Sequence, residues 1–226
     1  MQSDFDPIVK VAEEYGVAHL GLMTNESWQL DPRRLVFTLS RYKFVAKMLA
    51  GQRDVIEVGC GDGFGSRIVR QAVHNLDAIE PDPILLESAQ RHLPGRWPIH
   101  YFRHDLIADG PVPAIYDAAY AIDVLEHISW RDEDAFMRAF TQMIADHGIG
   151  IIGMPSLESQ PWASPQSAAG HINCKTEEAL RRTMSHHFHQ VLMFSMSDEV
   201  VHTGYDRMAH YRWAIGVSPR RTQTVG

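Results

Sequence analysis

The amino-acid sequence predicts an α/β protein with a doubly wound, mostly parallel sheet. The first observation is that strand-like and helix-like segments alternate between residues 54 and 154. Such alternation is typical of parallel strands joined by right-handed helical crossovers. The second is a cluster of glycines that directly follows the first of these strands and opens a helix. Doubly wound sheets bind ligands at the carboxyl ends of their strands, so we expect one cleft at that edge.

The elements before the glycine cluster follow from capping residues and apolar spacing. Asp31-Pro32 is a good helix start, because Asp caps a helix well and Pro suits its first position. Apolar residues recur at helical spacing from Leu35 to Leu49, and Gly51 suits the helix end. The apolar run at 54–58 then predicts a buried strand. The first thirty residues show no assignable pattern.

The same reasoning places the rest of the alternating region. A helix is expected after the glycine cluster, with Phe64, Ile68 and Ala72 on one face. Another is expected from about Asp132 to Ile144 and to be closed by Gly148. Further strands are expected at 76–80, 99–102, 116–122 and 149–154. One more helix is expected to begin at Asp82-Pro83, to carry Leu85, Ala89 and Leu93, and to end at Pro94-Gly95.

The C-terminal third departs from this alternation. Residues 156–170 are rich in Ser, Pro, Gln and Ala without apolar periodicity, which predicts a long loop, and loops of this length in compact domains are usually functional or disordered. Thr176 is expected to cap a helix. Two strands, at 191–195 and 208–217, are expected to form an antiparallel pair at the sheet edge. Residues 218–226 are expected to be a frayed end.

Composition narrows the possible partners. The chain has 226 residues, of which 45% are hydrophobic and 22% charged, as in one soluble globular domain. The net charge of -7 repels phosphate backbones, so we expect no nucleic-acid partner. No apolar run is long enough to span a bilayer, and residues 1–6 do not resemble a secretory signal. Two free cysteines fit a reducing compartment. We therefore expect a cytoplasmic protein without a membrane partner.

The most specific pattern is Glu57-Val-Gly-Cys-Gly-Asp-Gly63. Phe64 stands where the dinucleotide pattern requires its third glycine, which argues against a pyrophosphate site. An amino-acid group instead needs an acceptor for its ammonium and a pocket opened by glycines. Glu80 ends the second strand, where a carboxylate can accept both ribose hydroxyls. Asp105 follows the third strand, where it could accept from an adenine amine.

These residues resemble the class I S-adenosylmethionine-dependent methyltransferases. The resemblance rests on residues 57–63, 80–82, 104–106 and 116–127, and it is strong from about 55 to 154. Asp-Val-Leu-Glu-His-Ile at 123–128 is similar to the branch that methylates small molecules, such as the ubiquinone-pathway O-methyltransferases. The resemblance implies S-adenosyl-L-methionine as cofactor and S-adenosyl-L-homocysteine as product. It also implies a Rossmann-like methyltransferase fold with a seven-stranded sheet of order 3-2-1-4-5-7-6, in which strand seven is antiparallel.

The resemblance also implies an organisation and a set of site residues. We expect one methyltransferase domain over 1–226, with a helical cap at 1–51, a cofactor-binding half at 52–154, and an acceptor-side lid with C-terminal strands at 155–226. The glycines are expected to line the methionine part of the cofactor, Glu80 its ribose, and Asp105 with Leu106 its adenine. The full set of expected cofactor-binding residues is Tyr42, Glu57, Gly59, Cys60, Gly61, Gly63, Glu80, Pro81, Asp105, Leu106, Ile122 and Asp123.

Methyl transfer to a hydroxyl also needs a group that removes the proton. His127, after the fourth strand, and His171, at the end of the expected lid over residues 156–171, are the candidate catalytic residues, because imidazole titrates near neutral pH. His202 could join them around a metal ion, but no ligand motif supports this, so we expect no metal. Trp28 and Trp162 are candidates for the acceptor pocket.

The predicted function is methyl transfer to a hydroxyl of a small metabolite or activated sugar. Residues 154–204 are loosely similar to methyltransferases of bacterial surface-polysaccharide and sugar modification. N-methylation of an amine or phosphoramidate fits the same residues. An NAD-dependent oxidoreductase fits less well, because of Phe64 and the missing Tyr-x-x-x-Lys pair. A non-catalytic cofactor-binding module is disfavoured by the intact glycine loop and both acids.

Overall fold

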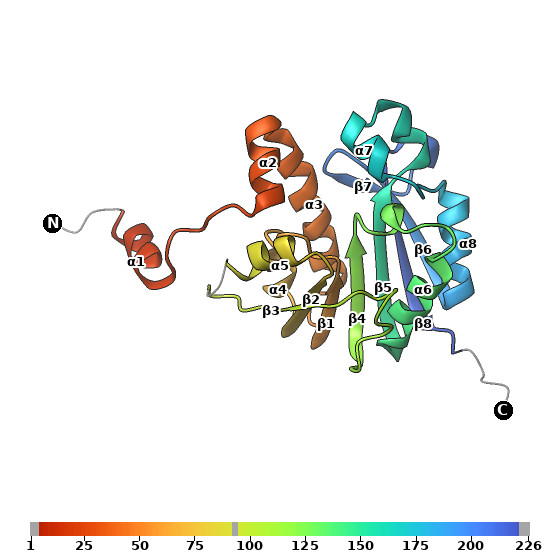
Figure 1. Ribbon diagram of the computed structural model, residues 1–226, viewed down its shortest axis with the longest axis horizontal. Helices are drawn as coiled ribbons and strands as arrows, with labels where there is room; N and C mark the ends of the chain where they lie inside the picture. Colours follow the sequence, from red (N-terminus) through yellow and green to blue (C-terminus); the bar gives the residue numbers. More distant parts are fainter. Residues whose placement is uncertain (1–4, 92–94, 222–226) are drawn as a thin grey trace.

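A mixed sheet forms the centre of the computed structural model, which describes residues 5–91 and 95–221 (Figure 1). Its strands are β1 (Asp54–Val58), β2 (Asn75–Glu80), β3 (His100–Arg103), β4 (Tyr116–Ile122), β5 (Ile144–Pro155), β6 (Phe188–Ser197), β7 (Val200–His202) and β8 (Tyr211–Pro219). These eight strands of the described chain have the order β3-β2-β1-β4-β5-β8-β6-β7. Strands β1 to β5 are parallel, whereas β8 is antiparallel to both β5 and β6.

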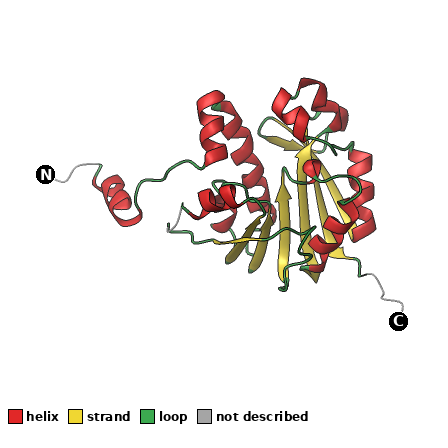
Figure 2. Cartoon of the chain, in the orientation of Figure 1, coloured by secondary structure: helices red, strands yellow, loops and turns green. Residues whose placement is uncertain are grey.

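Helices cover both faces of the sheet (Figure 2). The helices are α1 (Asp6–Tyr15), α2 (Leu22–Leu30), α3 (Arg33–Met48), α4 (Ser66–Arg70), α5 (Pro83–Gln90), α6 (Glu133–Gln142), α7 (Pro165–Gly170) and α8 (Glu177–His187), with short 3-10 helices η1 (Leu125–His127), η2 (Leu157–Trp162) and η3 (Asp206–Met208). Alternate strand residues face opposite sides. Val55 packs with α3, α4 and α5 in one apolar cluster, and Ile56 packs with α6 and α8 in the other.

The predicted strand order is confirmed, with one addition. β8 takes the seventh position and is antiparallel to its neighbours, as expected. The expected seven strands become eight because β7 pairs with β6 at the outer edge. The two strands expected to form an antiparallel pair, β6 and β8, do pair with each other, and β8 lies between β5 and β6. At only three residues, β7 is too short to show a periodic pattern in the sequence.

Two predicted boundaries near the sheet are corrected. α4 begins at Ser66, so Phe64 belongs to the glycine loop rather than to the helix. α6 ends at Gln142 and β5 begins at Ile144, so Gly148 lies within a strand and does not close a helix. The pairing of β4 with β5 shifts register between Tyr116 and Ala118, and this irregularity accommodates residues 145–148, Ala-Asp-His-Gly, between the paired Ile144 and Ile149.

The segment expected to be a long loop contains η2 and α7 instead. The serines that favoured a loop act as helix caps: Ser156 accepts from Ser159 N, and Ser164 accepts from Ser167 N. Thr176 caps α8 as predicted, by accepting from Ala179 N. The first thirty residues, which show no assignable pattern, contain α1 and α2.

The expected helix end at Leu93 and Pro94 lies outside the described residues, as do 222–226 of the expected frayed end. The described part of the expected frayed end is bound to the rest of the chain: Arg220 N donates to His187 O, and the Arg221 side chain pairs with Asp146. None of the described helices is both long and apolar enough to cross a bilayer.

Candidate active site

A cavity of about 460 Å³ opens at the carboxyl ends of the parallel strands. The loop after β1, the end of β4 and helices α2 and α3 surround it, and Ser167 and His171 close it from the side of α7. Its lining residues are Met23, Thr24, Glu26, Ser27, Arg34, Leu35, Phe37, Thr38, Leu39, Arg41, Tyr42, Gly59, Cys60, Gly61, Asp62, Phe64, Gly65, Ile122, Asp123, Glu126, His127, Pro155, Ser167 and His171.

The glycine loop has a backbone that side chains would not permit. Gly59 has φ +73°, and a Cβ at this position would lie 2.5 Å from Val124 Cγ2. Gly61 has φ +56°, in the left-handed region that favours glycine. The amides of Gly59 and Cys60 both donate to Ile79 O, at 2.8 and 3.1 Å, so β2 fixes the start of the loop. The backbone therefore borders the cavity directly.

Helix α2 is anchored to this loop by Asp62. Its carboxylate accepts from Thr24 N at 2.7 Å and from Thr24 Oγ1 at 3.2 Å. Leu22 N also donates to Ser88 Oγ at 3.1 Å. The two bonds to the Asp62 carboxylate are charge-assisted and therefore stronger than the neutral bond to Ser88. The first turn of α2 thus covers the cavity at the glycine loop.

Glu80 lies beside the loop at the end of β2. Its Oε2 accepts from Gly61 N at 2.9 Å, and its Oε1 accepts from Asp82 N at 3.0 Å. Burial raises the pKa of this carboxyl, and the two amide bonds oppose the rise. A separate cavity of about 60 Å³ lies close by and is lined by Gly59, Pro81, Asp105 and Leu106, among others.

Glu57 occupies a different place from the one expected of a cofactor-binding residue. It is buried on β1, outside the lining of both cavities, and Oε2 accepts from Tyr120 Oη at 2.9 Å. Burial raises the pKa of Glu57 to about 7, although the hydroxyls of Ser66, Tyr120 and Tyr42 favour its charged form. The carboxyl is therefore largely protonated in the folded protein at weakly acidic pH.

This raised pKa predicts a pH-dependent stability. Between about pH 4.5 and about pH 7 the folded protein binds more protons at Glu57 than the unfolded chain, so the free energy of unfolding falls as the pH rises. Glu57→Gln imitates the protonated form. The difference in the free energy of unfolding, variant minus original chain, is expected to increase by up to roughly 3 kcal/mol when the pH is raised from about 5 to about 8. Urea unfolding at both pH values measures the difference, with the exposed Glu87→Gln as control; an unchanged difference would contradict the prediction.

Arg41 and Asp123 form an ion pair across the cavity wall. Arg41 Nη1 lies 2.5 Å from Asp123 Oδ2, and the guanidinium carbon lies 4.1 Å from the centroid of the Tyr211 ring. Asp123 has φ +57°, an uncommon backbone for a residue with a side chain. Its Oδ1 is buried and has no hydrogen-bond partner among the described residues. Asp123, directly after β4, thus has one carboxylate oxygen in an ion pair and the other without a hydrogen-bond partner among the described residues.

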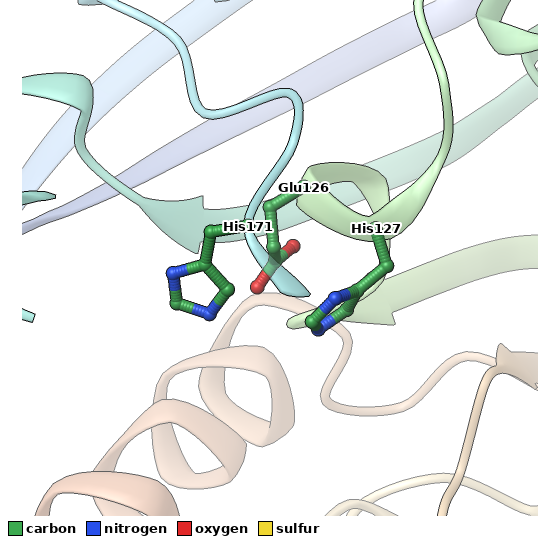
Figure 3. Close-up of side chains that lie close together, drawn as sticks. All are labelled: Glu126, His127 and His171. Atoms are coloured by element: carbon green, nitrogen blue, oxygen red, sulfur yellow. The ribbon is translucent and has the colours of Figure 1, made fainter. Parts of the chain in front are cut away.

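Two imidazoles and a carboxylate meet at another part of the same wall. Figure 3 shows the Glu126 side chain between the rings of His127 and His171, whose centroids are 5.4 Å apart. His127 Nδ1 lies 2.9 Å from Gly170 O, and His171 Nδ1 lies 2.9 Å from Gln160 Oε1. Burial, and to a smaller extent the charge of Asp123, raise the pKa of Glu126 well above its usual value. Burial and the nearby His127 lower the pKa of His171.

The structure brings most of the predicted site residues together. Eight of them line the large cavity: Tyr42, Gly59, Cys60, Gly61, Ile122, Asp123, His127 and His171. Gly59, Pro81, Asp105 and Leu106 line the small one. Glu57, Gly63 and Glu80 appear in neither lining. Trp28 and Trp162 are exposed and outside both linings, so the expectation that they line the acceptor pocket is not supported. His202 lies on β7 and is absent from the histidine cluster.

Sequence reasoning missed several cavity residues. Met23 and Thr24 were missed because α2 has no clear periodicity, and Arg41 because its partner Asp123 is distant in sequence. Glu126 was missed because its significance depends on its burial in the folded chain. These residues line the cavity with Arg34, Phe37 and Thr38 from α3.

Comparisons with known proteins agree with this architecture. The sequence matches the methyltransferase domain family over residues 31–187. A Mycolicibacterium smegmatis protein named "Probable S-adenosylmethionine-dependent methyltransferase" is 28% identical over 116 residues. That match covers 51% of this chain and 42% of the relative, so it spans less than half of the relative's length.

Solved structures show the same fold. The N-methyltransferase NodS from Bradyrhizobium japonicum, in complex with S-adenosyl-L-homocysteine, superposes with a TM-score of 0.62 at 15% identity, covering 85% of this chain and 92% of NodS. The magnesium protoporphyrin IX methyltransferase from Synechocystis, also with bound S-adenosyl-L-homocysteine, gives a TM-score of 0.59 at 17% identity, covering 95% and 94%. The S-adenosylmethionine-dependent class predicted from the sequence is confirmed. The chain belongs to the methyltransferase domain family.

Proposed function

We propose that this protein transfers a methyl group from S-adenosyl-L-methionine to a hydroxyl of a small metabolite or activated sugar. One observation carries the proposal: a single cavity is lined both by the glycine loop and by His127 and His171. A donor site and groups that can act on an acceptor proton therefore share one enclosed space. The volume of about 460 Å³ falls in the range of small-molecule sites.

The residues in the part of the cavity that the glycine loop lines fit S-adenosyl-L-methionine as the donor. The close approach of Gly59 to Val124 leaves backbone, rather than side chain, facing the ligand. We assign the methionine part to Tyr42, Ile122, Asp123 and the glycine loop. We assign the ribose to Glu80, and the adenine to the small cavity formed by Pro81, Asp105 and Leu106. When bound, this donor supplies a methyl group that its positively charged sulfur makes electrophilic.

The residues at the other end fit a hydroxyl acceptor. The hydroxyl oxygen gains the methyl group and releases its proton. Gly170 O and Gln160 Oε1 can only accept, so in the neutral imidazole each Nδ1 carries the proton and each Nε2 keeps its lone pair. His127 and His171 are therefore placed to take up the proton at Nε2. A base of this kind contributes about 10²- to 10⁴-fold.

The nearby polar side chains support a hydroxylated acceptor. Arg34, Thr38 and Ser167 line the same cavity and provide donors and acceptors for several hydroxyl groups. This chemistry suits an activated sugar, the acceptor class that the resemblance to enzymes of bacterial polysaccharide synthesis favours. The proposed setting is the cytoplasm, where activated sugars are made.

Two measurements test the proposal. Calorimetry with S-adenosyl-L-homocysteine is expected to show one site per chain, whereas NAD is expected not to bind. Transfer of labelled methyl from S-adenosyl-L-methionine is then measured on nucleotide-activated sugars and on matched amino sugars. A product methylated on oxygen supports the proposal, whereas methylation of the amine alone would show that the acceptor is an amine and not a hydroxyl. Binding of NAD but not of S-adenosyl-L-homocysteine would overturn the proposal of methyl transfer itself.

A further inference from the structure

Three groups that commonly bind metal ions converge at the acceptor end of the cavity. Glu126 and His127 are adjacent on η1, and His171 directly follows α7. One ligand atom from each residue lies within 4.8 Å of the others. Ligand atoms bound to one ion at about 2.1–2.2 Å are at most about 4.4 Å apart, so small side-chain rotations bring all three onto a single ion.

The environment of Glu126 favours a cation more strongly than the spacing does. The side chain is fully buried, and neither carboxylate oxygen has a hydrogen-bond partner in the described part of the chain. Such a group is strongly unfavourable in its charged form unless it has a partner, and a bound cation would supply one. The backbone of Glu126 is fixed in place, because its carbonyl oxygen accepts from Ile172 N at 2.9 Å and from Asn173 N at 3.0 Å. The same bonds tie Glu126 to the segment that carries His171.

Both histidines are oriented as metal ligands are. A ligating imidazole usually donates its second ring N–H to a carbonyl or carboxylate, which fixes the ring and leaves the other nitrogen for the metal. His127 has this arrangement with Gly170 O, and His171 has it with Gln160 Oε1. Two Nε2 lone pairs and one unpartnered carboxylate therefore remain at the cluster shown in Figure 3.

We propose that Glu126, His127 and His171 bind one divalent transition-metal cation, such as Mn²⁺, Co²⁺ or Zn²⁺. Imidazole and carboxylate ligands suit these ions, and three protein ligands leave positions open for substrate and water. The local charge is suitable, since Arg41 already pairs with Asp123 while Glu126 has no cationic partner of its own among the described residues. The absence of a short histidine motif, on which we expected no metal, does not bear on a site assembled from two separate segments.

This inference rests on the proposed function and deepens it. A divalent cation lowers the pKa of a hydroxyl that binds to it. With such an ion bound, the two Nε2 atoms would hold the cation, and the hydroxyl proton would pass to solvent water instead of to an imidazole. The cation would also select acceptors that present a hydroxyl at this end of the cavity.

Cobalt binding to the free protein tests the site without any turnover. After treatment with a chelator, the protein is titrated with Co²⁺ in the absence of donor, and the visible absorption and the heat are recorded. We expect one Co²⁺ per chain. His127→Asn and His171→Asn, which remove the Nε2 ligand, are each expected to weaken Co²⁺ binding by at least about tenfold, as is Glu126→Gln. If the buried Glu126→Gln does not fold, the two histidine variants decide.

Two exposed histidines, His186 on α8 and His189 at the start of β6, provide the matched control. The double variant His186→Gln/His189→Gln is expected to bind Co²⁺ as the original chain does. The proposal is overturned if no Co²⁺ binds, or if binding is lost in this control and kept in His127→Asn and His171→Asn. S-adenosyl-L-homocysteine binding is measured on the same samples. If the original chain binds S-adenosyl-L-homocysteine but no Co²⁺, the metal site alone is refuted. If the original chain does not bind S-adenosyl-L-homocysteine, the proposed function is refuted.

Discussion

Replacement of Glu80 by glutamine is expected to weaken S-adenosyl-L-homocysteine binding by about 100-fold. The carboxylate accepts from Gly61 N through one oxygen and from Asp82 N through the other. An amide has only one oxygen, so its NH₂ group must face one of these two N–H donors. The variant therefore disturbs the glycine loop and also loses an acceptor for the ribose hydroxyls. Calorimetry with the homocysteine product measures the change in affinity.

Glu87→Gln is the matched control for this substitution. Glu87 is an exposed carboxylate on α5 that pairs with Arg91 and lines neither cavity. Its removal is expected to leave the affinity unchanged, since exposed ion pairs contribute little. A loss of less than about threefold in Glu80→Gln would show that Glu80 does not hold the ribose.

Replacement of His171 by asparagine is expected to lower kcat by at least about 100-fold. Asparagine can keep a hydrogen bond toward Gln160 but has no atom in place of Nε2. The loss follows whether Nε2 takes up the acceptor proton or holds a cation that acidifies the hydroxyl. The affinity for S-adenosyl-L-homocysteine should remain within about threefold, because His171 is not among the residues assigned to the donor. Single-turnover methyl transfer and calorimetry separate the two effects.

The exposed His186 serves as the comparison for this variant. His186→Asn is expected to leave both kcat and the affinity unchanged. If His171→Asn reduced kcat by less than about tenfold, His171 would have no chemical role. A parallel loss of donor affinity would instead indicate that the substitution disturbs the whole cavity.

The strands and the donor loop could be predicted because their signals are local. A buried parallel strand is a short apolar run, and the glycine loop must follow β1 directly. The cavity cover could not be predicted in this way. α2 is held by Asp62, 38 positions from Thr24, and no pattern within α2 indicates that contact.

The acceptor end was predicted only in part for the same reason. His127 and His171 could be chosen from their positions after a strand and at the end of a loop. Glu126 could not, because its significance depends on complete burial and on the absence of a partner among the described residues, which only the folded arrangement reveals. The boundary errors at Gly148 and Ser156 came from residues that commonly end helices or form loops and here interrupt a strand or cap a helix.

The position of β8 affects how the chain can reach its native state. β8 is the last strand along the described chain, yet it bonds β5 on one side and β6 on the other. Until Tyr211–Pro219 leaves the ribosome, both neighbours present open edges, and β6 has no route into the main sheet. Open edges of this kind invite pairing between molecules. The sheet is therefore completed only after its other described strands have been synthesised, and a nascent protein stalled before this point is exposed to aggregation.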